Sequence, residues 1–244
     1  MLASDGNYYA VKFRNNPQDV RVLANELFVS RLAEKIDLPV PRAELVEVST
    51  DLIAATPELR IQLPGRQVLC ESGAQVGSRY ILQPAGVFDF LPEALFPRLH
   101  NREAFAGMLA FDAWLCNTDY RQALFIRLPR RRKYAAVFID NGHCFNQGAW
   151  DFPDAPLRGL FITRSIYDFV SGWPSFDPWL ASIESLDPAA IYCCARDIPP
   201  EWYGEPGDLE RLIGALVQRR HQVRRLLYQT RCALPMLFPS WSSS

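Results

Sequence analysis

The sequence predicts an α+β fold in which strands dominate the first part of the chain and helices the second. Short alternating segments near the N-terminus are typical of strands, whereas apolar residues at helical spacing follow later in the chain. With 244 residues, 49% of them hydrophobic and 12% aromatic, the chain can bury a large core as one domain or as a compact two-lobed unit. We expect a strand-rich part at residues 1–84 and a larger, mainly helical part at 85–244.

In the first part, alternation and apolar spacing predict a strand over 8–13, a helix over 19–36, a strand over 43–48, weak strands within 50–78 and a short strand over 79–83. The helix ends before Pro39, because a proline disfavours helical backbone at the residue before it. Pro84 and Gly86 follow the last strand, and we expect a hinge between the two parts there.

In the second part, the same signals predict a helix over 101–115, strands over 123–127 and 134–139, and helices over 162–170, 178–183, 188–194 and 208–231. A basic turn at 129–133 joins the two strands, and we interpret it as exposed to solvent. Asp208 follows Gly207 and has the position of an N-cap for the last helix.

Composition and charge exclude several classes of protein. A net charge of −1 argues against a protein that holds nucleic acid by bulk charge. There is no apolar run of membrane length and no secretory signal pattern, so we expect no membrane partner. Six cysteines without a C-x-x-C spacing and only three histidines argue against zinc. Together these features predict a soluble cytoplasmic protein with reduced thiols.

Lys12 and Glu26 are the first candidates for chemistry. Lys12 lies among apolar residues of the first strand, and Glu26 lies on the apolar stripe of the following helix. A buried carboxylate needs a cationic partner, and Lys12 is the nearest candidate. In kinases, such a pair places the ammonium group against nucleotide phosphates. The alternative is an exposed lysine on an edge strand and a glutamate at the margin of the stripe.

Asp119 and Asp140 are the second pair. Asp119 lies in a loop between helix and strand, where a carboxylate can orient an incoming hydroxyl. Asp140 ends a hydrophobic strand before Asn141-Gly142, where a carboxylate is free to bind Mg²⁺. The alternative is that both are ordinary turn residues. His143 and Cys144 follow closely and could touch a ligand, but neighbouring side chains of a strand point apart, which argues against a nucleophilic His–Cys pair.

The ordered set of these motifs resembles the HipA-like kinase family of bacterial proteins, whose fold is similar to that of two-lobed protein kinases. The resemblance runs from about residue 5 to at least residue 150, and it rests on Val11-Lys12-Phe13, Asn25-Glu26, Leu38-Pro39-Val40-Pro41, Phe111-Asp112-Ala113-Trp114, Asn117-Thr118-Asp119 and Ile139-Asp140-Asn141-Gly142.

The resemblance implies that ATP and Mg²⁺ bind between the two lobes. It assigns Lys12 to the phosphates, Glu26 to holding Lys12, Asp119 to the catalytic acid, Asp140 to the metal, and Leu82 and Gln83 to the adenine.

The sequence departs from the kinase pattern in three places. No Gly-rich phosphate loop precedes Lys12, and no His-Arg pair precedes Asp119. Kinases carry an asparagine five positions after the catalytic aspartate, and Leu124 occupies that position here. Gln122 is the nearest amide and could reach the metal through a shifted loop, while Arg121 could neutralise phosphate charge.

Three functions are compatible with these residues. The first is a kinase that transfers the γ-phosphate of ATP to a hydroxyl, that of Ser or Thr in a protein. The second is a degenerate pseudokinase that acts as a binding or regulatory module. The third is a phosphotransferase for a small molecule held by aromatic residues of the helical part, namely Trp150, Phe152, Trp173, Phe176 and Trp179. The residues leave the acceptor, the oligomeric state and an antitoxin-like partner open.

Overall fold

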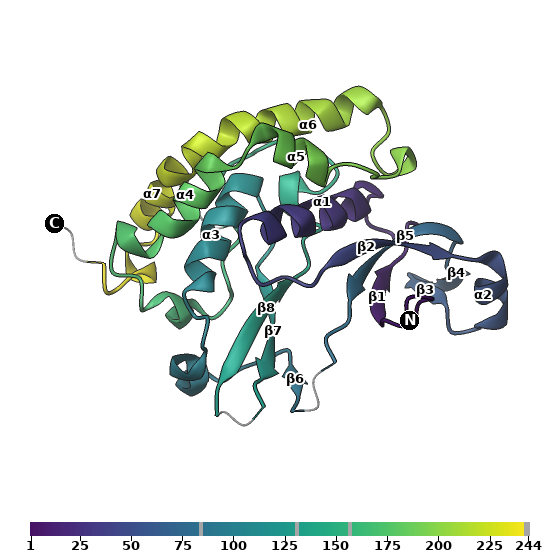
Figure 1. Ribbon diagram of the computed structural model, residues 1–244, viewed down its shortest axis with the longest axis horizontal. Helices are drawn as coiled ribbons and strands as arrows, with labels where there is room; N and C mark the ends of the chain where they lie inside the picture. The colour runs from purple at the N-terminus through teal and green to yellow at the C-terminus, as the bar shows by residue number, and fades with distance from the viewer. Residues whose placement is uncertain (83–84, 130–131, 156–157, 242–244) are drawn as a thin grey trace.

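The chain begins with a three-stranded antiparallel sheet (Figure 1). The structure is a computed structural model and describes residues 1–82, 85–129, 132–155 and 158–241. The strand order is β1-β5-β2, with bounds Tyr9–Lys12, Gly73–Arg79 and Ala43–Val48. Lys12 is the last residue of β1 and lies opposite Val76 of the central strand. The predicted strands at 8–13 and 43–48 are therefore confirmed.

Helix α1, Arg21–Lys35, lies between this sheet and the helices at the end of the chain (Figure 1). It contacts β2 and β5 on one side and α5, Pro188–Cys194, on another. Every residue from Val22 to Ser30 is buried, Glu26 included, although the sequence indicates a single apolar stripe. Because neighbours cover α1 on more than one face, its polar residues have to find partners inside the protein.

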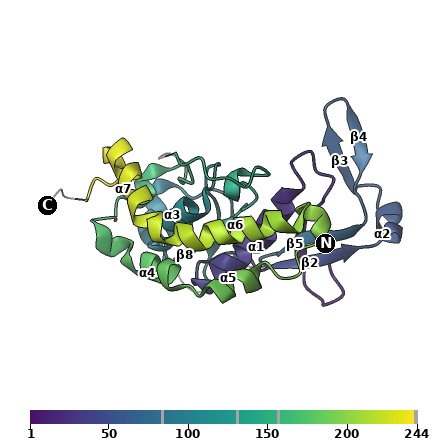
Figure 2. The ribbon, with the colours of Figure 1, turned by 90° about the horizontal axis from the view of Figure 1, so that it is seen from above.

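The segment between β2 and the hinge contains more regular structure than the weak strands predicted for 50–78. It forms α2, Thr50–Ala55, then the β3–β4 hairpin, Arg60–Leu63 and Arg66–Leu69, then β5. Figure 2 shows the hairpin projecting from the body of the molecule. The sequence of β5 gives only a weak strand pattern, because this central strand is built mainly from small and polar residues. At Gly77 a β-carbon would collide with Val46 and Tyr9 of the two flanking strands.

The second sheet is also antiparallel and has the order β6-β7-β8, with bounds Val87–Phe88, Gln122–Arg127 and Tyr134–Ile139. The predicted strand at 79–83 is wrong, because β5 ends at Arg79; its last position, Gln83, lies outside the described residues, as do 130 and 131 of the basic turn. The helices of this part are α3, Ala104–Leu115; α4, Asp177–Ser185; α5; α6, Pro206–Arg219; and α7, Val223–Ala233.

Two predictions about helices in the second part are wrong. Residues 162–170 hold only a short 3-10 turn, Arg164–Tyr167. The predicted helix at 208–231 is divided by a 3-10 turn into α6 and α7. At the start of α6, Glu205 occupies the cap position and Pro206 begins the helix. Asp208 therefore lies inside the first turn, where its carboxylate pairs with Arg21 of α1.

The main hydrophobic core runs without a break from α1 and Val76 of β5 through α3 and the second sheet to the C-terminal helices. A smaller core joins Phe13 to α2 and to Cys70. Among the described residues, no helix is long and apolar enough to cross a membrane. The division of the chain at residue 84 stays a prediction, since residues 83 and 84 lie outside the described part.

Candidate functional site

Lys12, Glu26 and Asp140 meet where the two sheets approach each other. Lys12 comes from β1, Glu26 from α1 and Asp140 from the loop after β8. The Lys12 ammonium donates a hydrogen bond to Glu26 Oε1 and another to Asp140 Oδ1, the latter over 2.7 Å. Lys12 and Glu26 thus form the ion pair that the sequence predicts, and the same nitrogen also joins Asp140, 128 positions away.

The electrostatics of this cluster are set by burial and by the shared ammonium group. Burial alone would lower the pKa of Lys12, but the two carboxylates outweigh it and raise the pKa above its usual value. Burial raises the pKa of Glu26, against the opposing effect of Lys12. For the half-buried Asp140, the attraction of Lys12 outweighs the effect of burial, so the pKa of Asp140 is lowered. The cluster therefore favours the charged form of Lys12 and the ionised form of Asp140.

Helix α1 also holds the backbone that follows Asp140. Glu26 Oε1 accepts a 3.0 Å hydrogen bond from the Gly142 N–H. Asn25 Nδ2 donates to the carbonyl oxygens of Gly142, Cys144 and Gln147 at 2.8, 3.0 and 2.8 Å. A β-carbon at position 142 would collide with Val22, so only glycine permits this close approach of loop and helix.

Gln122 lies beside Asp140, as the shifted-loop interpretation requires. Its Nε2 donates a 2.9 Å hydrogen bond to Asp140 Oδ2. Strand β7 begins at Gln122, only three residues after Asp119, so Leu124 is already inside the strand and lies opposite Val137. The loop is therefore two residues shorter than the kinase pattern, and the amide at its end is Gln122.

These residues line a cavity of ≈ 580 Å³ between the two sheets. This volume lies within the range of small-molecule and cofactor sites, roughly 300–1,000 Å³. The lining includes Lys12, Glu26, Tyr80, Ile81, Gln122, Leu124 and Asp140. Leu82 instead lies in a neighbouring depression and is 63% exposed, whereas Tyr80 and Ile81 line the cavity. Gln83 lies outside the described residues.

Asp119 stands outside the lining of this cavity, at the junction of two loops. Its Oδ1 accepts a 2.7 Å hydrogen bond from the Tyr120 N–H, and its own N–H donates to Asn117 Oδ1. The side chain is 42% exposed, and its Oδ2 lies 4.0 Å from Nδ1 of His143. Asp119 is thus accessible to an acceptor and close to the loop that carries Asp140.

Arg121 does not face the cavity, because it forms a buried ion pair with Asp112 of α3. Its guanidinium group contacts both oxygens of Asp112, and it also donates to the Ile139 carbonyl at 3.0 Å and to Asn141 Oδ1 at 2.9 Å. The suggested contact of Arg121 with phosphate is therefore wrong. Arg121 instead holds the loop of Asp140 from the side that does not face the cavity. Asp112 outweighs burial and raises the pKa of Arg121.

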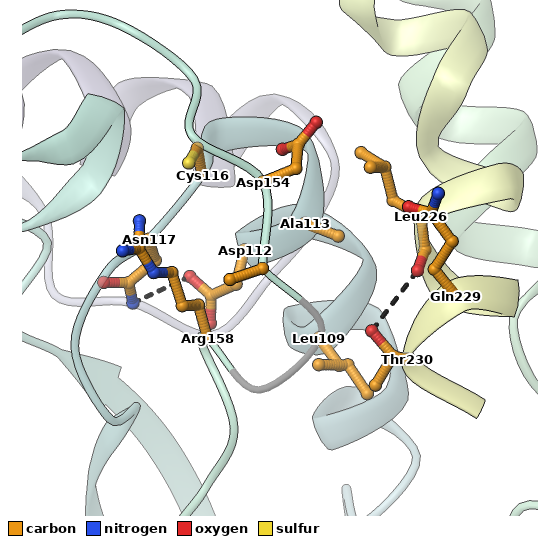
Figure 3. Close-up of a pocket in the computed structure, with 11 residues that line it drawn as sticks. Leu109, Asp112, Ala113, Cys116, Asn117, Asp154, Arg158, Leu226, Gln229 and Thr230 are labelled. Atoms are coloured by element: carbon orange, nitrogen blue, oxygen red, sulfur yellow. Dashed lines mark hydrogen bonds between the residues drawn. The ribbon is translucent and has the colours of Figure 1, made fainter. Parts of the chain in front are cut away.

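Figure 3 shows Asp112 and Asn117 at the wall of a small cavity between the end of α3 and helix α7. Asn117 Nδ2 donates a 3.1 Å hydrogen bond to Asp112 Oδ1, and its oxygen holds the Asp119 N–H. The cavity, of ≈ 30 Å³, has room for about one water molecule. Sequence reasoning missed the roles of Asp112 and Asn25; a polar residue within an apolar helix was the available signal for both.

The donor set fits a magnesium ion that is shared with phosphate groups. Mg²⁺ usually binds through one or two carboxylates together with substrate phosphates and water. Asp140 and Gln122 supply two oxygen-bearing side chains next to each other. Among the described residues, no group of three or more His, Cys, Asp or Glu side chains could hold a metal by itself. These residues would therefore hold the ion only in combination with a ligand.

The fold and the cluster define a class, the proteins with a kinase-like fold. The chain is similar to CtkA, a proinflammatory kinase of Helicobacter pylori, with a TM-score of 0.58 and 14% identity over 96% of this chain and 94% of that one. It is also similar to the Golgi casein kinase, with a TM-score of 0.52 and 9% identity over 94% of this chain and 70% of that one. No curated protein sequence matches.

Within this class, the chain belongs to the HipA-like kinase family, whose sequence model matches residues 2–125. The match includes Lys12, Glu26, Asp119 and Gln122, and it ends before Asp140, earlier than the resemblance extends in the sequence. Fold and family together indicate a phosphotransferase of the kinase type.

Proposed function

We propose that this protein transfers the γ-phosphate of ATP to a hydroxyl group of Ser or Thr in a protein, with Mg²⁺ as the metal. The observation that carries the proposal is Lys12, which bonds to both Glu26 and Asp140 at the wall of the ≈ 580 Å³ cavity. In kinases, the lysine that corresponds to Lys12 contacts the nucleotide phosphates. The aspartate that corresponds to Asp140 holds the metal.

Each residue of the cluster has a separate task in this proposal. Lys12 binds phosphate oxygens while Glu26 fixes its position. Asp140 and Gln122 would hold Mg²⁺, which neutralises the charge that develops on the phosphates when it is bound. Asp119 accepts the proton of the hydroxyl through Oδ2, since Oδ1 is engaged by the Tyr120 N–H. Arg121 and Asn25 keep the backbone on either side of Asp140 in place.

The structure offers little support for a small-molecule site made of the aromatic residues. Trp173 and Phe176 pack against Trp241, and Phe152 lies under the guanidinium group of Arg219. The ring of Trp179 leaves no room for a β-carbon at Gly107 of α3. These side chains are thus used in packing.

The test is incubation with γ-labelled ATP and Mg²⁺, followed by detection of labelled protein. Lys12→Ala and Asp140→Ala should abolish labelling, whereas Lys35→Ala, at an exposed position of α1, and Asp51→Ala, at an exposed position of α2, should leave it unchanged. Labelling that survives the first two substitutions would refute the proposal.

Thermal shift distinguishes the kinase from a binding module. Ligand at about 100 times its Kd adds about 2.7 kcal/mol to the stability of the folded state. Stabilisation by ATP that requires Mg²⁺ and is lost in Asp140→Ala, together with labelling, supports the kinase. The same stabilisation without turnover indicates a nucleotide-binding pseudokinase, and no shift at millimolar nucleotide indicates a module that does not use ATP.

A further inference from the structure

The imidazole of His143 faces Oδ2 of Asp119, the carboxylate oxygen that accepts no hydrogen bond from the described residues. Asp119 Oδ1 is engaged by the Tyr120 N–H at 2.7 Å. Oδ2 lies 4.0 Å from His143 Nδ1. His143 follows Asp140 by three residues, so it links the catalytic acid to the loop of the metal ligand.

His143 is held in this position from several directions. Its carbonyl oxygen accepts hydrogen bonds from the N–H and the hydroxyl of Thr118, at 3.1 and 3.2 Å. On its ring, Nδ1 lies 3.3 Å from Nε2 of Gln147, and Nε2 lies 3.5 Å from Nε2 of Gln18. The side chain is 21% exposed, so it keeps contact with solvent on one side. The distance between the imidazole and Asp119 is therefore set by the fold.

A separation of 4.0 Å between Oδ2 and Nδ1 is too long for a direct hydrogen bond. It suits a hydroxyl oxygen at about 2.8 Å from both atoms, which donates its proton to Asp119 Oδ2 and accepts from the Nδ1–H of His143 in place of the Gln147 amide. We propose that Asp119 and His143 hold the acceptor hydroxyl between them, so that His143 is a second acceptor-binding residue. This inference rests on the proposed kinase activity and assigns the acceptor side of the same site.

The chemical step then balances as follows. The hydroxyl oxygen forms a bond to the γ-phosphorus, and the bond from that phosphorus to the β–γ bridging oxygen breaks, leaving its electron pair on ADP. The hydroxyl proton passes to Oδ2 of Asp119. His143 exchanges no proton and only fixes the direction of attack.

The first test compares His143→Ala with the parent protein in the full chain. We expect phosphate transfer to fall at least about tenfold, because a misplaced nucleophile loses the advantage of orientation. The Mg²⁺-dependent thermal shift with ATP should remain at the parent value, since His143 does not line the nucleotide cavity. His143→Asn should recover part of the rate, because its amide places a hydrogen-bonding atom near the position of Nδ1. His221→Gln, at an exposed position between α6 and α7, is the matched control.

The second test is a double-mutant cycle with Asp119→Asn. Two groups that hold the same hydroxyl act as a unit, so their effects should not add. We expect His143→Ala to reduce the rate much less when Asp119→Asn is already present. Additive losses of rate would overturn the proposal that Asp119 and His143 hold the same hydroxyl. So would an active parent whose His143→Ala variant transfers phosphate at the parent rate, or a loss of rate that comes with loss of the ATP shift. A parent without any phosphate transfer would overturn the proposed function itself and this role with it.

Discussion

At the scale of single residues, the surroundings of Asp140 bear on the proposed binding of a metal ion. Both of its carboxylate oxygens accept hydrogen bonds within the protein, Oδ1 from Lys12 and Oδ2 from Gln122. It also adopts a left-handed backbone conformation with φ 63°, which is uncommon outside glycine but which aspartate adopts more readily than most residues. Without nucleotide, a cation must compete with the Lys12 ammonium for Oδ1. Nucleotide phosphates would relieve this competition by attracting Lys12.

We therefore expect Lys12→Met to bind free Mn²⁺ more tightly than the parent protein does when no nucleotide is present. Removing the ammonium leaves two carboxylates facing the site, and a gain of about 1.4 kcal/mol corresponds to tenfold in affinity. Titration of Mn²⁺ followed by electron paramagnetic resonance measures the free ion directly. Lys35→Met, at an exposed position of α1, is the control. Equal or weaker binding by Lys12→Met would contradict the competition.

At the scale of elements, the buried pair of Asp112 and Arg121 connects α3 to both functional loops. Their side chains are 0% and 1% exposed. Arg121→Met leaves the Asp112 carboxylate without its cation, and breaking a buried pair costs about 3–5 kcal/mol of unfolding free energy. Denaturant unfolding should show this loss, and Asp112→Leu combined with Arg121→Met should recover part of it. Arg14→Met, which breaks an exposed pair with Glu71, should cost at most about 1 kcal/mol. A loss of 1 kcal/mol or less in Arg121→Met would refute the role of the pair.

The sequence predicts those elements whose pattern is regular, and it fails where contacts between separate elements decide the structure. Alternation around Lys12 and helical spacing around Glu26 locate β1 and α1, and the cost of a buried carboxylate predicts their pairing. Strand β5 is predicted only as part of the weak strands within 50–78, because Gly77 and its small neighbours carry no apolar pattern. The direction of Arg121 is missed. The partner of Arg121, Asp112, lies nine residues earlier on another element, and only the folded structure brings both behind Asp140.

At the scale of the whole molecule, contacts with both parts of the chain fix the position of α1. In addition to its contacts with the first sheet, α1 is tied to the C-terminal helices at both ends. Arg21 pairs with Asp208 of α6 and donates to the Tyr203 carbonyl at 3.1 Å. Arg31 donates to the carbonyl oxygens of Cys194 and Arg196 at 3.2 and 2.6 Å. Glu26 is thus held against Lys12 by the second part of the chain as well as by the first.

This attachment predicts that α1 unfolds together with the C-terminal helices. Amide hydrogens in the middle of α1 and of α3 should exchange at similar, slow rates, because both elements belong to one continuous core and open only with global unfolding. The β3–β4 hairpin projects from the body, and most of its residues are exposed, so its amides should exchange orders of magnitude faster (Figure 2). Arg31→Ala removes the contacts with Cys194 and Arg196 and should speed exchange in the second half of α1 before that in α3. Hydrogen-exchange mass spectrometry resolves these segments. If α1 of the parent protein exchanges as fast as the hairpin, the helix moves independently, and the Lys12–Glu26 pair forms only on binding.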